Sequence, residues 1–228
     1  MAKTTITILI ICLTLSHGFG QEQETKVVKD LELWTSAGIS KKLNKHWKIS
    51  FDQEVRFLNE MSEFNTWFSD LGVDYKLNKH FRFGTNYRFY QIKEDDNQLN
   101  TQHRFSADFK YKQKIDRFAI EYRLRAQNKD EDFLESATNE NIFNIRNRIS
   151  LSYNIKHWKA DPFFDAELYR RMYTLQDGKY SKLRWTMGVE FPIYKNSEVK
   201  VFYRVDNELN TSYPKDTYII GLGYKYSF

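Results

Sequence analysis

The sequence is poor in the residues that build disulfide frameworks, thiolate-bound metal sites and membrane helices. Its 228 residues include one Cys, at position 12, with three Pro and nine Gly. A single thiol forms neither an internal disulfide nor a Cys-ligated metal site. Apart from the amino-terminal stretch, no segment approaches the ~20 apolar residues that a membrane helix needs. These absences exclude a disulfide-stapled fold and a helical membrane bundle.

The chain also lacks an excess of one charge sign and the sequence patterns of common enzymes. Lys and Arg number 35 against 30 Asp and Glu, which gives a formal charge of +5, and the two signs are interspersed. No basic block of the kind that binds nucleic acid is present. HExxH, Walker and GxGxxG patterns are absent. We therefore expect no nucleic-acid partner, no metal and no cofactor.

The first 20 residues have the organisation of a cleavable signal peptide. Lys3 provides a positive start, an apolar run extends from residue 6 to 15, and Gly18 and Gly20 precede a cut before Gln21. A lipoprotein signal at Cys12 is the alternative, and it is disfavoured because Ile precedes that Cys. The mature chain then contains no cysteine. Residues 21–30 are polar and unpatterned, and we expect a tail there.

The rest of the chain alternates between apolar and charged residues with a period of two. In the segment 47–57, Trp47, Phe51 and Phe57 share one face, whereas Lys48 and Glu54 share the other. Such alternation is typical of β-strands with two different environments. Eleven segments follow this pattern: 31–41, 47–57, 67–77, 81–91, 101–112, 117–128, 142–155, 158–173, 183–193, 199–209 and 216–228.

The connections between these segments alternate in length. Tight connections at 43–46, 77–80, 113–116, 155–157 and 194–197 alternate with longer ones that are rich in Asp, Glu, Asn and Ser. Short turns at one rim and longer loops at the other are typical of up-and-down transmembrane barrels.

Three of the tight turns share a small repeat, NKHW, NKHF and IKHW, which places His46, His80 and His157 at the short-turn rim. A metal site is one reading of these histidines. Repeated turn chemistry next to an aromatic girdle at the membrane interface is the other, and we favour it.

The size of the apolar set indicates which face points outward. A soluble barrel would have to hold about two large aromatics per strand inside, and its interior is too small for that. We therefore predict an all-β, transmembrane, antiparallel up-and-down β-barrel over residues 31–228, with the aromatics facing lipid. Eleven segments conflict with the usual even number, so about twelve strands are expected, with ten as the alternative. A β-sandwich is the soluble alternative.

The last strand, DTYIIGLGYKYSF, ends the chain on an aromatic residue. Tyr224, Tyr226 and Phe228 lie on one face, as in the carboxyl-terminal signal by which outer-membrane barrels are recognised for assembly. We expect the cell outer membrane of a Gram-negative bacterium as the location. Outer-membrane lipid and the barrel-assembly machinery are the expected partners, with a monomer as the expected state.

The charged faces are predicted to fill the lumen with ion pairs of both signs and to plug it largely, because unpaired charges there would be costly. The lumen-facing candidates for binding are Glu54, Arg56, Arg88, Arg104, Arg123, Arg125, Arg146, Arg148 and Glu167.

Short motifs in order along the chain carry a resemblance to a known family. They are LELW at 31–34, QEVR at 53–56, YKL at 75–77, YRF at 87–89, RLR at 123–125, RNR at 146–148, AEL around Glu167 and the aromatic end. With them the mature chain resembles the small outer-membrane barrels of Bacteroidetes called domain of unknown function 2490. The resemblance implies a fold and a compartment but no activity. Arg170, on the face assigned to lipid, departs from the pattern and is tolerable only near a rim.

We predict no catalytic residue and a structural, adhesive or transport role for small solutes or lipids. A lipid-modifying barrel enzyme is the alternative, and it would have to use His103, Glu54 or Glu167, because His103 is the only histidine after residue 20 outside the tight turns.

Overall fold

The computed structural model describes residues 27–94, 98–128, 143–172 and 178–228, which form eleven β-strands. The predicted signal peptide lies outside these residues. No helix among them is long and apolar enough to span a membrane. The strands are β1 (Val28–Lys42), β2 (Trp47–Leu58), β3 (Glu63–Lys76), β4 (Phe81–Lys93), β5 (Leu99–Ile115), β6 (Phe118–Gln127), β7 (Phe143–Tyr153), β8 (Asp161–Met172), β9 (Gly178–Tyr194), β10 (Ser197–Glu208) and β11 (Lys215–Ser227).

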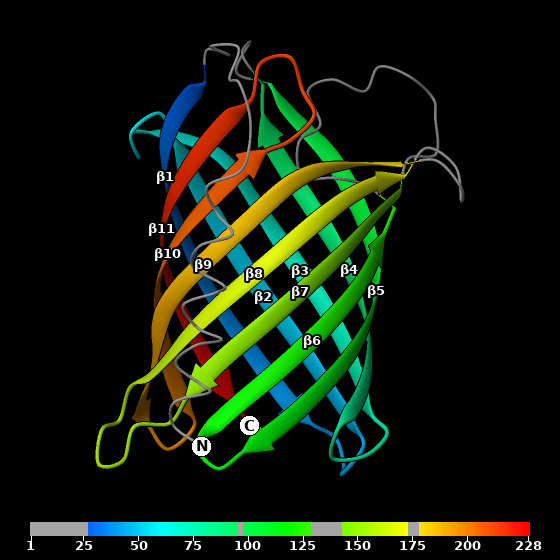
Figure 1. The fold of residues 1–228 in the computed structure, drawn as a ribbon, viewed down its shortest axis with the longest axis vertical. Coiled ribbons are helices and arrows are strands. Elements are labelled where there is room, and N and C mark those ends of the chain that lie inside the picture. The colour runs from blue at the N-terminus through cyan, green and yellow to red at the C-terminus, as the bar shows by residue number, and fades with distance from the viewer. Residues whose placement is uncertain (1–26, 95–97, 129–142, 173–177) are drawn as a thin grey trace, which may run out of the picture.

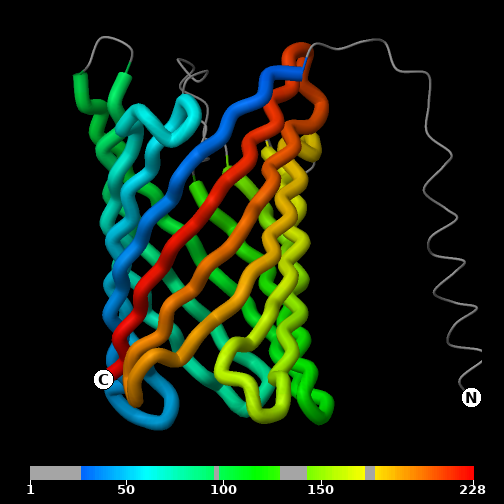
Figure 2. Tube along the Cα trace, turned by 90° about the vertical axis from the view of Figure 1, so that its left-hand side faces the viewer, coloured from blue at the N-terminus to red at the C-terminus, as the bar shows by residue number. Residues whose placement is uncertain are grey.

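The eleven strands close into one barrel, in which consecutive strands pair antiparallel (Figure 1). The ring is closed by β1 and β11, which lie side by side and run parallel from Val28↔Lys215 to Ser40↔Ser227 (Figure 2). Both strands start at the end with the longer loops and finish at the end with the short turns. This parallel seam closes an odd ring directly, so neither the twelfth strand nor the ten-strand alternative expected from the sequence is needed.

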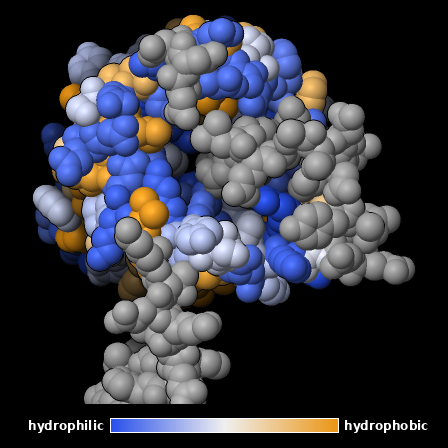
Figure 3. Space-filling view, turned by 90° about the horizontal axis from the view of Figure 1, so that it is seen from above, coloured by the Kyte–Doolittle hydropathy of each residue, from blue (hydrophilic) through white to orange (hydrophobic). Residues whose placement is uncertain are grey.

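The two faces of the barrel have the polarity predicted from the alternation. Outward side chains such as Leu71, Phe105 and Ile149 are 54%, 59% and 58% exposed. Inward Arg104 and Asp108 are 2% and 4% exposed. Seen from the loop end, the described surface is mainly hydrophilic (Figure 3). An apolar outside around a charged inside is the reverse of a soluble barrel, and it is typical of barrels that face lipid.

Several strand ends differ from those expected. β1 begins at Val28, three residues before the predicted barrel start, and β9 begins at Gly178 rather than at residue 183. β8 begins at Asp161 rather than at Trp158, because the chain turns at His157, whose φ is 66°. Near the loop end of β8, a register shift follows Tyr169, and Arg170 pairs with Tyr180 two residues before the strand ends. Arg170 thus lies near a rim, as its charge requires.

The end of the chain is part of the seam. The backbone N–H of Phe228 donates to the carbonyl of Ser40 at 2.8 Å, and the hydroxyls of Ser40 and Ser227 lie 3.1 Å apart. The rings of Tyr226 and Phe228 meet edge to face with centroids 4.8 Å apart. The residues predicted to form the assembly signal therefore lie where the barrel closes. Their role in assembly stays a prediction.

Candidate functional site: the lumen

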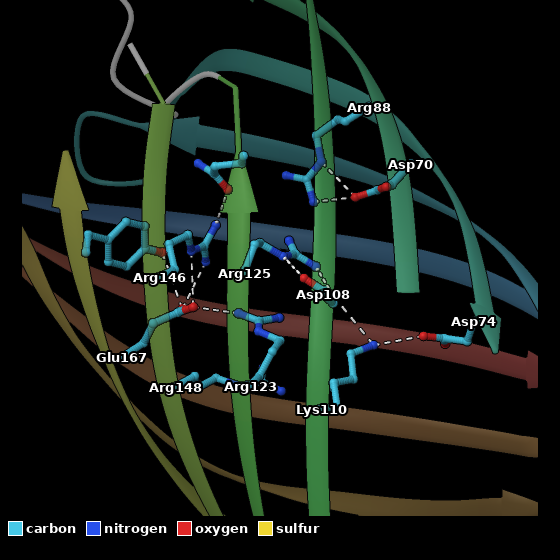
Figure 4. Close-up of polar contacts among 12 residues, drawn as sticks. Asp70, Asp74, Arg88, Asp108, Lys110, Arg123, Arg125, Arg146, Arg148 and Glu167 are labelled. Carbon is cyan, nitrogen blue, oxygen red and sulfur yellow. Dashed lines mark hydrogen bonds and ion pairs between the residues drawn. The ribbon is translucent and has the colours of Figure 1, made fainter. Parts of the chain in front are cut away.

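Glu167 is the centre of a buried ion-pair cluster in the lumen. Its carboxylate accepts from Arg123 Nη2 at 2.5 Å and from Arg146 Nε and Nη2 at 3.1 and 2.9 Å (Figure 4). The Tyr169 hydroxyl adds a longer contact at 3.4 Å, and Arg146 also donates to Gln127 at 3.1 Å. Glu167 is 3% exposed. One carboxylate therefore compensates two buried guanidinium groups.

A second cluster lies beside the first, on β3 to β6. Arg125 forms a bidentate pair with Asp108 at 2.6 and 2.7 Å. Lys110 joins that aspartate to Asp74, with Nζ–Oδ distances of 3.6 and 3.0 Å. The labelled side chains of both clusters project into the same space (Figure 4). Fork-shaped pairs of this kind fix geometry as well as charge.

Further ion pairs continue the network around the wall. Asp206 receives Arg184 Nε and Nη2 at 2.7 and 2.5 Å, with Lys182 at 3.7 Å. Further pairs of this kind are Arg88–Asp70, Arg56–Glu54, Arg148–Glu121, Lys200–Glu190 and Lys215–Asp30.

Aromatic rings alternate with the guanidinium groups in a band around the lumen. The Arg56 guanidinium lies 3.6 Å from the centroid of the Trp34 ring, and that of Arg88 lies 3.7 Å from the centroid of Phe68. Arg146 lies 4.3 Å above Tyr169. Such contacts strengthen when water is excluded. We call this band the arginine–aromatic belt; it comprises Trp34, Arg56, Phe68, Arg88, Tyr90, Arg104, Arg146, Tyr169, Arg184 and Arg204.

Several members of the belt are buried in the middle of the lumen. Phe68, Tyr90 and Tyr169 are 2%, 2% and 1% exposed, although each points inward from the barrel wall. Arg104 and Arg146, at 2% and 4%, are equally covered. These large side chains occupy the interior at this level of the barrel.

Above the belt, toward the loops, the lumen opens into a cavity of about 590 Å³, which we call the outer cup. Trp34, Tyr90 and Asp206 contribute to its lining, together with Lys182 and Gln102. The Tyr90 hydroxyl and Gln102 Oε1 are buried and have no hydrogen-bond partner among the residues that the structure describes. Buried polar atoms of this kind usually find a partner, so the cup has hydrogen-bonding capacity left for a ligand or for water.

The nine lumen candidates from the sequence all lie in this network or in the belt. The structure brings Arg123, Arg146 and Glu167 into direct contact. Sequence reasoning missed the inward aromatics Trp34 and Tyr169, because it assigned the large rings to lipid. A signal was present, since Phe68 and Tyr90 fall on the charged faces of their segments.

The histidines of the tight turns have a structural explanation. In the first NKH turn, the Asn44 side chain accepts from the backbone N–H groups of His46 and Trp47, at 2.8 and 2.9 Å, and Asn78 does the same in the second. His46 Nδ1 lies 2.8 Å from the Lys76 carbonyl, which can only accept, so Nδ1 carries the proton. Among the described residues, no group of three or more His, Cys, Asp or Glu could hold a metal ion.

His103 lies on the outer face, as the alternation predicts. Its Nδ1 is 2.7 Å from the Tyr87 hydroxyl, and its ring stacks on Tyr87 and meets Phe89 edge to face. These contacts are all with aromatic side chains, so no Ser or carboxylate among them could act together with the imidazole. The two lumen carboxylates considered for chemistry are engaged as well, Glu54 by Arg56 and Glu167 by two arginines.

The comparisons with known proteins agree with a barrel of unassigned role. No curated protein matches the chain in sequence. A bacterial polysaccharide outer-membrane secretin is similar in structure at 12% identity and a TM-score of 0.48; the likeness covers 80% of this chain and 63% of that one, so this chain spans less than two thirds of its length. The β domain of the Bordetella autotransporter BrkA is similar at 11% identity and a TM-score of 0.44, over 82% of this chain and 86% of that one. The sequence profile described as protein of unknown function (DUF2490) matches residues 31–217, and the chain therefore belongs to the DUF2490 family.

Proposed function

We propose that this chain is an outer-membrane barrel with a closed lumen, which acts without catalysis as a scaffold that presents its loops and its outer cup to the outside. The single observation that carries the proposal is the arginine–aromatic belt. Seven of its ten residues are 1–5% exposed and lie in the middle of the barrel, where a diffusion channel would need water: Trp34, Phe68, Tyr90, Arg104, Arg146, Tyr169 and Arg184. A structural, adhesive or ligand-binding role fits such a barrel better than passive diffusion does.

The apolar outer face supports the membrane location. Outward side chains on different strands are exposed: Phe83 on β4 at 46%, Met187 on β9 at 54% and Leu222 on β11 at 49%. Monomeric soluble proteins rarely expose contiguous apolar surface on this scale. The seam at Phe228 fits the expectation that the barrel-assembly machinery inserts the chain as a monomer.

Location and orientation are tested by labelling single cysteines on whole cells. The chain from Gln21 onward contains no Cys, so an added thiol is the only target after cleavage. Glu60→Cys, at the loop rim, should react with an impermeant maleimide on intact cells. Lys195→Cys, in a short turn, should react only after the outer membrane is permeabilised. The reverse order of labelling, or recovery of the protein as a soluble periplasmic species, would refute the proposed location.

Closure of the lumen is tested by solute entry. Liposomes that contain the purified barrel should swell in isosmotic arabinose no faster than protein-free liposomes. A swelling rate that rises with the amount of barrel would make the protein a diffusion pore and would refute the closed scaffold.

A further inference from the structure

The short-turn rim carries exposed lysines at every one of its turns. Within or beside the five turns lie Lys45, Lys79, Lys114, Lys156 and Lys195, all of them exposed. None has an ion pair or a side-chain hydrogen bond with any other described residue. This contrasts with the lumen, where buried cations such as Arg125, Arg146 and Arg184 face carboxylates.

Each of these lysines is accompanied by an aromatic residue at or next to the same turn. Trp47 follows Lys45, and Trp158 follows Lys156, with exposed fractions of 43% and 51%. Tyr194 precedes Lys195 and is 79% exposed. The other two companions are Phe81 and Phe118, at the starts of β4 and β6. Five turns thus repeat one combination, an unpaired lysine close in sequence to an aromatic residue, and this aromatic residue is exposed at four of the five turns.

The NKH turns hold this combination in a fixed geometry. The ring of His46 stacks on that of Tyr75 at 5.7 Å and 22°, and His80 stacks on Tyr111 at 5.9 Å and 23°. His80 Nδ1 lies 3.1 Å from the Lys112 carbonyl, in the same arrangement as its counterpart in the first turn. In two neighbouring hairpins, the same Asn, His and Tyr contacts therefore hold the turn that carries the lysine.

We propose that the short-turn rim binds the headgroups of anionic phospholipids in the leaflet that it faces. Exposed aromatic rings of membrane proteins lie at the membrane–water interface, at the depth of the lipid headgroups. The lysines next to these rings would therefore lie close to the lipid phosphates. A lysine side chain can place its ammonium group among the headgroups while its methylene carbons lie against the apolar surface of the barrel. The rings on the lipid side favour a lipid over a soluble acidic polymer, which would use the cations but not the rings.

The inference rests on a membrane location and is independent of whether the lumen is closed. Conductance and solute entry report on the lumen alone. Lipid binding reports on the rim, so the failure of one proposal leaves the other intact.

The test is retention of phosphatidylglycerol by the purified full-length mature barrel in zwitterionic detergent, measured by native mass spectrometry against phosphatidylcholine. The wild-type barrel should retain phosphatidylglycerol preferentially, and the preference should decline as salt is raised. The triple variant Lys45→Gln, Lys79→Gln and Lys195→Gln should lose affinity, by about fivefold per lysine. The corresponding Lys→Arg triple variant keeps the three positive charges and should keep the wild-type affinity for phosphatidylglycerol.

A matched triple variant at the loop end provides the control. Lys29→Gln, Lys93→Gln and Lys179→Gln remove the same charge and should leave phosphatidylglycerol retention at the wild-type level. Heat-modifiable migration in gels checks that both variants are folded. Equal retention of the two lipids, equal losses in the two triple variants, or full competition by inorganic phosphate would overturn the proposal. Loss of binding to acidic peptidoglycan fragments with unchanged lipid retention would overturn it as well.

Discussion

At the scale of single residues, Glu167 has the most demanding position in the molecule. Two guanidinium groups, those of Arg123 and Arg146, share its carboxylate in a site where it is 3% exposed. Bringing three charges into such a site costs free energy that their mutual attraction offsets only while all three are present. The cluster as a whole adds little net stability, but removal of Glu167 alone would leave two buried charges uncompensated and would destabilise the barrel.

Glu167→Ala should destabilise the barrel by roughly 3–5 kcal/mol, because it leaves two buried arginines without their partner. Glu167→Gln should cost less, since the amide oxygen still accepts a hydrogen bond. Unfolding of the reconstituted barrel in urea, followed by tryptophan fluorescence, measures both. Glu60→Ala removes an exposed carboxylate at the loop rim and should leave the midpoint unchanged. A midpoint for Glu167→Ala that equals that of the Glu60 control would refute the description of a desolvated cluster.

Two inward glycines show how closely the interior is packed. A Cβ at Gly221 would lie 1.9 Å from the ring of Phe202, whereas one at Gly223 would lie 3.0 Å from its nearest neighbour, the Ser36 hydroxyl oxygen. Forcing an extra methyl into a packed interior costs about 1–3 kcal/mol. Gly221→Ala should therefore destabilise the barrel more than Gly223→Ala does, in the same urea experiment. Equal effects would mean that Phe202 moves aside freely.

At the scale of elements, the alternation of each strand could be predicted from the sequence, and the way the ring closes could not. Inward Arg88 and outward Phe89 are neighbours in the chain, and a period of two separates them without further information. Pairing between β1 and β11 is different, because it joins residues about 190 positions apart and leaves no local signature. The expectation of an even strand number came from other barrels and not from these residues.

The belt shows a second limit at the element scale. Trp34 falls within LELW, and the period of two places it with Glu32 on the face opposite Leu33, so its ring points inward. Its indole N–H donates to Glu32 at 2.6 Å, and Arg56 covers its face. An inward role for Trp34 and Tyr169 was not predicted, because the large rings were generally assigned to lipid. Inward glycines leave room for other inward rings, since Phe202 packs against Gly221 and Phe163 against Gly188.

The seam gives a prediction about the terminal strand. Deletion of Phe228 removes both its ring and the backbone bond to Ser40, and it should lower the yield of heat-modifiable, membrane-inserted barrel. Phe228→Ala keeps the backbone bond and separates the two contributions. Deletion of Asp130, in a longer connection, is the control and should assemble normally. Equal assembly of the Phe228 and Asp130 deletions would count against a role for the terminal aromatic.

At the scale of the whole molecule, the barrel has an apolar outer wall and an ion-paired polar interior. The ion pairs and the belt connect strands that are neighbours or lie up to three places apart in the ring, such as β9 and β1 through Arg184 and Trp34. The outer cup lies toward the loops, and its Tyr90 hydroxyl and Gln102 oxygen have no hydrogen-bond partner among the described residues. This arrangement suits a protein that binds or presents something at one face of a membrane.

Planar-bilayer recording of the wild-type barrel is the most direct test of the closed lumen. The belt predicts a quiet bilayer, with no stable open-channel steps at moderate voltage in concentrated salt. Insertion is verified in the same preparation by protection of the strands from protease. The double variant Trp34→Ala and Tyr169→Ala, which removes two rings from the belt, should show small conductance steps. Large, stable, porin-like conductance of the wild type would contradict the account.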